Sequence, residues 1–495
     1  MREEEERPTS VAIVGAGVSG LAAGLAMQAA GFPFTIFEKG TEVGGTWRDN
    51  RYPGLTIDVP SPIYTYREHR HPGWRRWMPD GPEILEYHRQ VSSRTGLREH
   101  IRFETEITAA DWRDDHWLLR TAQGDEHRCR AVVFASGFLH HPYTPDLPGL
   151  EEFDGEVVHS ARWRDDIAVQ ARRVGVIGSG STGTQLVGAL GGVASHLTQF
   201  QRTPQWIFPS VNFGVPRAVR SVLARRPGSI DAMTDRIERL ADWLLGGAAT
   251  SPGRRRDLFD LVARLHLRTV RDPELRARLT PTEQPLCRRP VLSTRYYRAV
   301  QRPDVSVVDT RIERVTRDGI VTADGTLHRL DVLILATGFR AHEYMRPIAI
   351  TGEDGLTLEQ AWADGPHGYR TVALTGFPNL FMVLGPHSPL VSISIHGSAQ
   401  LQSDYIVQLL DVLERPEVNC LSPSPEATAR WLDHVRAGMA DTVWATGCSS
   451  WYVGTGSVPV LWPYDRRAWQ KLLRTPDLRD YTVQPAVPSP TGPST

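Results

Sequence analysis

Lysine is nearly absent from this chain: only Lys39 and Lys471 are lysines among its 56 basic residues. The 57 acidic residues balance the arginines, and the formal net charge is −1. A chain without a strong excess of one charge gives no electrostatic argument for a nucleic acid or an acidic membrane as partner. We therefore expect neither.

Cysteine is also scarce, with four residues in 495 and no pair at C-x-x-C or C-x-x-x-x-C spacing. The four are Cys129, Cys287, Cys420 and Cys448. A thiol–disulfide relay needs two sulfurs within bridging distance, so a disulfide reductase is not expected. Four scattered cysteines in a chain of this length are typical of the reducing cytosol.

Long apolar runs are missing as well. No uninterrupted hydrophobic stretch reaches the length that a membrane span requires. Residues 1–7 are charged and lead directly into a strand pattern, which leaves no space for a signal peptide. We expect a cytoplasmic protein without membrane insertion, and its length predicts two or more domains. The oligomeric state stays open.

The segment 10–38 has the pattern of a strand, a glycine turn, a helix and a second strand. Gly15, Gly17 and Gly20 form the turn in G-x-G-x-x-G spacing, and Glu38 ends the second strand. Such a turn lets the backbone approach a pyrophosphate, which then faces the N–H groups at the start of the helix. The acid can accept hydrogen bonds from ribose hydroxyls. The pattern predicts a dinucleotide site.

A second copy of this pattern begins at residue 173 and reaches residue 201. Its turn contains Gly178, Gly180, Ser181, Thr182 and Gly183. Its second strand ends in Arg202 instead of an acid. An acid there would repel the 2′-phosphate of NADPH, whereas an arginine can pair with it. The second site is therefore predicted to take NADPH in preference to NADH.

Two dinucleotide sites in one chain predict hydride transfer from a nicotinamide to a flavin. Without a redox disulfide, the simplest acceptors for the flavin's electrons are O₂ or a partner protein. Between about residues 215 and 285 strand signals vanish, and apolar residues recur at helical spacing in 230–245 and 258–279. We interpret this region as a helical insertion in the second domain. The tail at 485–495 is rich in proline, serine and threonine and is expected to be disordered.

The stretch from Phe153 to Trp163 reads F-D-G-E-V-V-H-S-A-R-W. It resembles the F-x-G-x-x-x-H-x-x-x-W signature of class B flavin monooxygenases. Tryptophan at its end is typical of the Baeyer–Villiger branch, whereas relatives that oxygenate nitrogen or sulfur usually have tyrosine or phenylalanine. Arg164 departs from the proline or aspartate that the signature expects next. The resemblance implies that His159 and Trp163 help to couple domain motions, and ordinary packing is the alternative.

Further segments resemble the same family. Residues 44–54 resemble its flavin-contacting loop, residues 200–206 its NADPH-phosphate segment, and residues 336–339 its second dinucleotide-associated turn. Residues 450–456 resemble a mobile loop that closes over NADP. The resemblance assigns these residues to the cofactors: Gly45, Thr46, Trp47, Asp58, Arg202, Thr203, Thr337 and Gly338.

The run Cys-Arg-Arg-Pro at 287–290, followed by a Tyr-Tyr pair, resembles the segment that carries the family's active-site arginine. The resemblance implies that Arg289 is catalytic and that Asp58 positions and tunes it. A permanently charged guanidinium can stabilise a flavin C4a-peroxide anion and the oxyanion of its adduct with a ketone. Arg288 in that role, a structural ion pair at Arg289 and a plain turn residue at Asp58 are the alternatives.

Together these patterns predict an α/β fold with two Rossmann-like dinucleotide-binding domains. Residues 1–150 and 335–495 would bind FAD, and residues 151–334, with the helical insertion, would bind NADPH. The resemblance implies insertion of one oxygen atom from O₂ next to a ketone carbonyl, giving an ester or lactone. N- or S-oxygenation, electron delivery to a partner protein and a non-catalytic flavin-binding module are the alternatives. No metal site is predicted, and the sequence does not identify the substrate.

Overall fold

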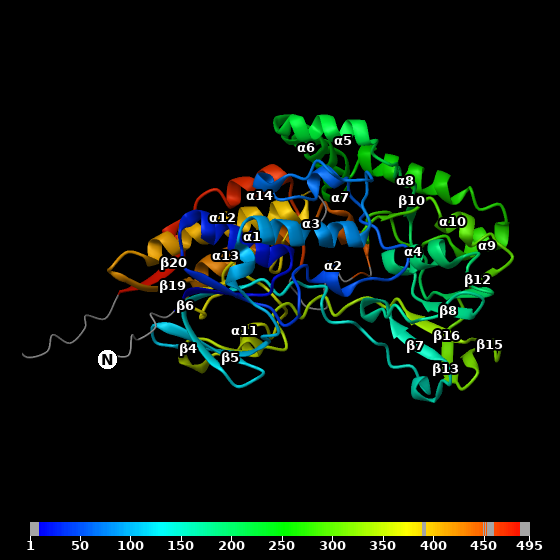
Figure 1. The fold of residues 1–495 in the computed structure, drawn as a ribbon, viewed down its shortest axis with the longest axis horizontal. Coiled ribbons are helices and arrows are strands. Elements are labelled where there is room, and N and C mark those ends of the chain that lie inside the picture. The colour runs from blue at the N-terminus through cyan, green and yellow to red at the C-terminus, as the bar shows by residue number, and fades with distance from the viewer. Residues whose placement is uncertain (1–8, 389–392, 449, 451, 453–459, 486–495) are drawn as a thin grey trace, which may run out of the picture.

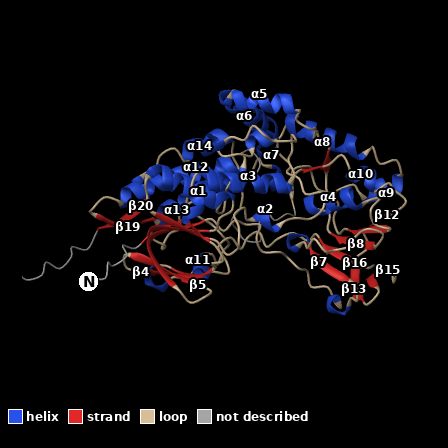
Figure 2. Cartoon of the chain, in the orientation of Figure 1, coloured by secondary structure: helices blue, strands red, loops and turns tan. Residues whose placement is uncertain are grey.

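The computed structural model describes residues 9–388, 393–448, 450, 452 and 460–485. All but the first residue of the predicted disordered tail lies outside these residues. Figure 1 shows two bodies that each contain a sheet, with a group of helices along one edge. Figure 2 shows the strands gathered at the two ends and the helices above them.

The first body contains the larger sheet. Its strands are β1 (Thr9–Val14), β2 (Phe34–Phe37), β3 (Ile101–Arg102), β4 (Ile107–Arg113), β5 (His116–Thr121), β6 (Glu126–Phe134), β17 (Ala349–Thr351) and β18 (Leu380–Met382). They lie in the order β17-β4-β5-β6-β1-β2-β3, with β18 also paired to β6. Strands β6, β1, β2 and β3 are parallel, whereas β4, β5 and β6 pair antiparallel.

Strand β1 is apolar from Val11 to Val14 because both faces of the sheet are covered there. Val11 and Ile13 belong to one core cluster, and Ala12 and Val14 belong to another on the opposite face. A parallel strand buried on both faces requires such an unbroken apolar run. Helices α1 (Val18–Ala30), α3 (Gly81–Arg94) and α12 (Ile395–Leu413) contribute to the first cluster, and α1 packs against α12.

The second body has five parallel strands. They are β7 (Glu156–His159), β8 (Arg173–Ile177), β9 (His196–Phe200), β12 (Val305–Val308) and β16 (Val332–Leu335). Their order is β12-β9-β8-β16-β7, and α4 (Ser181–Leu190) connects β8 to β9. A small antiparallel sheet of β13 (Ile312–Thr316), β14 (Gly319–Thr322) and β15 (Leu327–Arg329) follows β12. The two strand–helix–strand units expected from the sequence are thus confirmed, while the domain boundaries stay a prediction.

Helices occupy most of the region from about residue 215 to 285, where the sequence shows no strand pattern. Between β10 (Ile207–Phe208) and β11 (Val291–Leu292) lie α5 (Arg217–Arg225), α6 (Pro227–Ala241), a π-helical turn (Asp242–Gly246), α7 (Gly247–Thr250), α8 (Arg254–Leu267) and α9 (Pro273–Arg278). The segment 258–279 is two helices and not one. Asp272 caps α9 by accepting from the backbone N–H of Glu274, and Pro273 occupies the first position, where no N–H donor is needed.

The remaining α-helices and strands are α2 (Thr46–Asp49), α10 (Tyr296–Ala299), α11 (Leu358–Ala361), α13 (Pro425–Gly438), α14 (Arg466–Leu472), β19 (Val418–Pro423) and β20 (Tyr481–Pro485).

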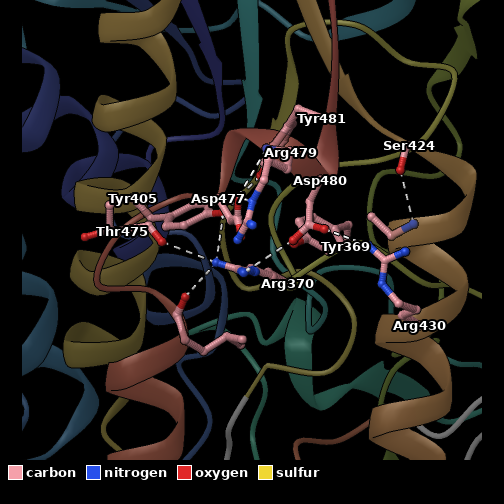
Figure 3. Close-up of polar contacts among 12 residues, drawn as sticks. Tyr369, Arg370, Tyr405, Ser424, Arg430, Thr475, Asp477, Arg479, Asp480 and Tyr481 are labelled. Atoms are coloured by element: carbon pink, nitrogen blue, oxygen red, sulfur yellow. Dashed lines mark hydrogen bonds and ion pairs between the residues drawn. The ribbon is translucent and has the colours of Figure 1, made fainter.

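Arg370 connects the C-terminal segment to the first body. Arg370 Nη1 donates to the carbonyl of Leu472, and Nη2 lies 3.6 Å from Asp480 (Figure 3). Asp480 also accepts from Tyr369 at 2.5 Å and from Arg430 at 2.7 Å. Because the side chains of Arg370 and Asp480 are only 15% and 19% exposed, this cluster is partly shielded from solvent.

The cysteines correct the expectation that no two of their sulfurs lie within bridging distance. Cys287 and Cys448 form a disulfide with 5.2 Å between their Cα atoms, although 161 residues separate them. The spacing rules fail here because they detect only cysteines that are close along the chain. Cys129 and Cys420 are free and buried. Within the described residues, no helix is both long and apolar enough to cross a membrane.

Candidate active site

The first glycine turn closes tightly against β6. Gly15 has a φ of +105°, and a Cβ added there would lie 2.8 Å from the carbonyl oxygen of Ala135. A Cβ on Gly20 would lie 1.7 Å from the carbonyl oxygen of Gly15. A side chain at Gly15 would therefore push the turn away from the end of β6, and one at Gly20 would push α1 away from the turn, which explains two of the three glycines.

Glu38 lies at the end of β2, and its carboxylate fixes this turn. It accepts from the backbone N–H of Ala16 at 2.8 Å and of Gly40 at 2.7 Å. Arg48 donates to the same carboxylate at 2.7 Å. Burial opposes the charge of Arg48, but Asp49 and Glu38 outweigh it and raise the pKa of Arg48. Sequence reasoning missed Arg48, since no motif marks it. The predicted role of Glu38 toward a ribose stays a prediction.

A cavity of about 340 Å³ begins at this turn, and we call it the dinucleotide cavity. It brings together nine of the predicted residues: Gly15, Gly17, Glu38, Gly45, Thr46, Trp47, Asp58, Ser181 and Arg289. Gly17 and Gly45 face each other, because a Cβ on Gly45 would be 3.1 Å from the Cα of Gly17. Both bodies contribute to this cavity, since Ser181 is the first residue of α4 in the second body.

The second glycine turn repeats the construction of the first. Gly178 has a φ of +127°, and a Cβ on Gly183 would lie 2.3 Å from the carbonyl oxygen of Gly178. At Gly180 an added Cβ would meet nothing within 4 Å, so the start of α4 is open there. Thr182 lies in the first turn of α4, facing Tyr52 of the first body.

Arg202 is exposed immediately after β9, and the Thr203 carbonyl accepts from Ser179 at 2.6 Å. The predicted NADPH residues thus line the carboxyl end of the second sheet, outside the dinucleotide cavity except for Ser181.

The signature residues and the turn at 336–339 lie where the two bodies are connected. Thr337 donates to the Tyr143 carbonyl at 2.5 Å, and Tyr143 donates back to the carbonyl of Gly338 at 2.9 Å. His159 is buried 6.2 Å from the Phe339 ring, and burial lowers its pKa. Trp163 is buried in the second body's core, and its carbonyl accepts from Arg51 of the first body at 3.4 Å. These contacts are consistent with the coupling role that the resemblance implies.

Arg289 and Asp58 form a bidentate ion pair. Nε and Nη2 of Arg289 donate to the two carboxylate oxygens of Asp58 at 2.5 and 2.6 Å. Burial disfavours the guanidinium charge, but Asp58 outweighs this effect and raises the pKa of Arg289. Arg288 instead pairs with Glu283 at 2.9 Å. Of the two candidate arginines, Arg289 is therefore the one that lines the dinucleotide cavity.

A second cavity of about 370 Å³, which we call the apolar cavity, lies beneath the helical insertion. Its walls include Phe208, Leu244, Leu245, Phe259 and Val262. Four residues line both cavities: Asp58, Tyr64, Arg289 and Ile395. The two cavities therefore meet at the ion pair, so a ligand in the apolar cavity would reach the same guanidinium as a ligand in the dinucleotide cavity.

Two tyrosines flank this shared wall; sequence reasoning assigned no role to Tyr64 and gave Tyr452 only a place in the predicted mobile loop. Tyr64 accepts a hydrogen bond from Trp47 Nε1 at 2.9 Å. Tyr452 is buried and hydrogen-bonded to Arg289; burial, only partly offset by Arg289, raises its pKa to about 12. Ser450 donates to the Cys287 carbonyl at 3.0 Å. The rest of the predicted mobile loop, residues 451 and 453–456, lies outside the described residues.

Comparison with known proteins agrees with this arrangement. Residues 8–244 match the family model described as flavin-binding monooxygenase-like. An uncharacterized monooxygenase of Mycobacterium tuberculosis is 44% identical over 87% of this chain and 86% of its own length. A Baeyer–Villiger monooxygenase of Streptomyces coelicolor is 34% identical over 99% of this chain and 95% of its own. The chain belongs to the flavin-binding monooxygenase family, in its Baeyer–Villiger branch.

A solved structure is similar to this monooxygenase over the whole fold. Cyclohexanone monooxygenase from Rhodococcus, bound to NADP⁺, has a TM-score of 0.87 and 32% identity, covering 97% of this chain and 100% of that one. The family indicated by residues 153–163 is thus confirmed, as is the fold with two dinucleotide-binding domains. Arg164, which departs from the signature, is exposed and paired with Glu156 at 3.1 Å, away from both cavities.

Proposed function

We propose that this enzyme uses NADPH and O₂ to insert one oxygen atom next to a ketone carbonyl, giving an ester or lactone. The observation that carries the proposal is the position of Arg289. Its guanidinium, held by Asp58, lies in the wall shared by the dinucleotide cavity and the apolar cavity. Oxidant and substrate would therefore meet beside a fixed positive charge.

The residues of the dinucleotide cavity fit FAD. Gly15, Gly17 and Gly45 leave backbone exposed where a pyrophosphate would approach, and the start of α1 offers its N–H groups. Glu38 would accept from the ribose. Bound there, FAD would supply a ring that accepts hydride and, once reduced, activates O₂. The open start of α4 and the exposed Arg202 fit the phosphates of NADPH.

Arg289 would act as a permanent cation and not as an acid. Because its pKa is raised, it keeps its proton throughout the physiological range. A carbonyl attacked by an anionic oxidant becomes an oxyanion, and a preorganised guanidinium stabilises both negative charges. Asp58 fixes the orientation of the guanidinium through two hydrogen bonds. The apolar walls contributed by the insertion would keep water from the reacting groups.

This arrangement favours ketones over nitrogen or sulfur centres. Oxygen transfer to a heteroatom uses a protonated oxidant and develops no oxyanion on the substrate, so it gains little from a fixed cation. Arg164, which departs from the Baeyer–Villiger signature, lies on the surface in an ion pair and lines neither cavity. Electron delivery to a partner protein would leave the apolar cavity without a use.

Mass spectrometry of products formed with NADPH and ¹⁸O₂ tests the proposal. The enzyme would be given a mixed panel of cyclic ketones, linear ketones and sulfides. We expect esters or lactones that carry one ¹⁸O atom. Labelled sulfoxides with unchanged ketones would assign the enzyme to heteroatom oxidation. NADPH consumption in step with reduction of an added protein acceptor, without labelled product, would show electron transfer instead.

A further inference from the structure

Exposed apolar side chains are concentrated on the helical insertion. The described residues include fourteen large hydrophobic side chains that are exposed, and seven of them lie between residues 219 and 265. These seven are Val219, Val222, Leu240, Trp243, Leu258, Leu261 and Leu265. We call them the insertion's apolar surface. Singly exposed apolar residues are ordinary, but half of those among the described residues fall within about a tenth of the chain length, and such a concentration marks a contact surface.

Helix α5 has the pattern of a helix that lies on an interface. None of its nine residues, all of them described, is buried. Val219, Val222 and Leu223 share one face of the helix, as their spacing of three and four requires. Arg217 and Arg225, at the two ends of the helix, are exposed, and from there long side chains can reach toward charged groups; Arg220 instead donates to the Gly73 carbonyl at 3.3 Å. In Figure 1, α5 and α6 form the outer edge of the molecule.

The insertion is basic although the whole chain is not. Residues 217–267 contain ten arginines and six acidic residues, a net charge of +4, whereas the chain has −1. Within α5 and the residue that follows it, Arg217, Arg220, Arg225 and Arg226 occur without an acid. Helices with basic and apolar side chains together are typical of surfaces that bind anionic lipid headgroups. The net charge of the whole chain therefore does not reveal the local excess of positive charge on the insertion.

The apolar cavity reaches the same surface. Leu258 of α8 lines that cavity and is also 46% exposed. Leu244 and Leu245 line the cavity, while the preceding Trp243 is 60% exposed. Leu258, Leu261 and Leu265 lie at positions i, i+3 and i+7 and so share one face of α8. An apolar molecule on this face would therefore contact Leu258, which belongs to the wall of the cavity that also contains Arg289.

We propose that the insertion's apolar surface docks on an anionic lipid bilayer and that the enzyme takes its ketone from the membrane. The part about the ketone rests on the proposed function, whereas the docking does not. A second copy of the chain is the weaker candidate for this surface. A symmetric self-contact would bring two sets of arginines together, and like charges facing each other are unfavourable.

Co-sedimentation of the FAD-loaded protein with lipid vesicles tests the docking. Vesicles of phosphatidylcholine with about one third phosphatidylglycerol should bind the protein, and vesicles of phosphatidylcholine alone should bind it far less. Since an arginine near an anionic surface contributes about 1 kcal/mol, Arg217→Gln and Arg225→Gln should each lower the association constant about fivefold. Val222→Asp should abolish binding.

Val193→Asp is the matched control, because Val193 is 43% exposed but lies outside the insertion. It should bind vesicles as the parent does. All variants should retain FAD and oxidise a water-soluble ketone at the parent rate, which separates docking from the proposed function. Equal binding to neutral and anionic vesicles would overturn the proposal. So would a dimer, measured by sedimentation equilibrium, that Val222→Asp dissociates, since the surface would then be a self-contact.

Discussion

Replacing Arg289 by alanine should stop oxygen transfer without stopping NADPH oxidation. The guanidinium donates two hydrogen bonds to Asp58 and lines both cavities. The predicted NADPH residues Gly178, Gly180 and Arg202 instead follow the carboxyl ends of strands in the second sheet. Loss of one preorganised group that stabilises an oxyanion lowers kcat about 100- to 1000-fold, or roughly 2.7–4 kcal/mol. Arg289→Ala should therefore lower ketone turnover by that factor, while hydride transfer to FAD continues and the electrons appear as H₂O₂.

Two further variants separate charge from geometry. Arg289→Lys keeps the positive charge but loses the bidentate pairing with Asp58, so its ketone turnover should lie between those of the parent and the alanine variant. Arg288→Ala is the matched control, because Arg288 pairs with Glu283 and lines neither of the two cavities. It should retain ketone turnover within about twofold.

The assay compares labelled ester, NADPH consumed and H₂O₂ released in the same reaction. Stopped-flow reduction of the bound FAD by NADPH gives the hydride step separately. Ketone turnover within about twofold of the parent in Arg289→Ala would refute the reasoning, as would an equal loss in Arg288→Ala. A loss of FAD reduction in Arg289→Ala would place the arginine in the hydride step instead.

Three further predictions follow from other parts of the structure. Arg202→Gln should raise the KM for NADPH about 10- to 100-fold and leave that for NADH unchanged, because only the 2′-phosphate loses a charge-assisted bond; steady-state kinetics with both nucleotides measures this. Asp480→Ala should lower the thermal unfolding midpoint, since it leaves Arg370 half-buried without its carboxylate, and Asp433→Ala, at the exposed pair with Arg436, should not. His88 is fully buried, and burial lowers its pKa to about 3, so between pH 6.5 and 3 the unfolded chain binds a proton that the folded chain does not. The free energy of unfolding should fall as pH falls through this window, and His88→Gln should reduce the slope of that free energy against pH by about 1.4 kcal/mol per pH unit. Urea titrations at several pH values measure this slope, and an unchanged slope in the variant would contradict the assignment.

The sequence predicted those parts of the site that depend on local backbone geometry. Gly15 and Gly178 both adopt a positive φ after a strand, and the third glycine of each turn lies against the first. A short run of residues determines such a turn, so its motif can be recognised in one sequence. The resemblance also indicated Arg289 and Asp58, which are 231 positions apart and form the ion pair. Their catalytic and positioning roles stay predictions.

Other features depend on contacts between distant segments, and no local pattern reports them. The disulfide between Cys287 and Cys448 spans 161 residues, and the contact of Tyr452 with Arg289 arises from the same approach of two segments. The apolar cavity has walls from the insertion, the first body and the C-terminal part of the chain. Its position required the tertiary structure, as did the observation that Leu258 is both in its wall and at the surface.

A single-turnover experiment tests the central claim most directly. The enzyme's FAD would be reduced by one equivalent of NADPH without oxygen and then mixed with ¹⁸O₂ and a cyclic ketone. The account predicts one lactone per FAD, labelled with one ¹⁸O atom at the ring oxygen, from the parent enzyme and almost none from Arg289→Ala. Equal yields of labelled lactone from both proteins, or H₂O₂ alone from the parent with every ketone of the panel, would contradict it.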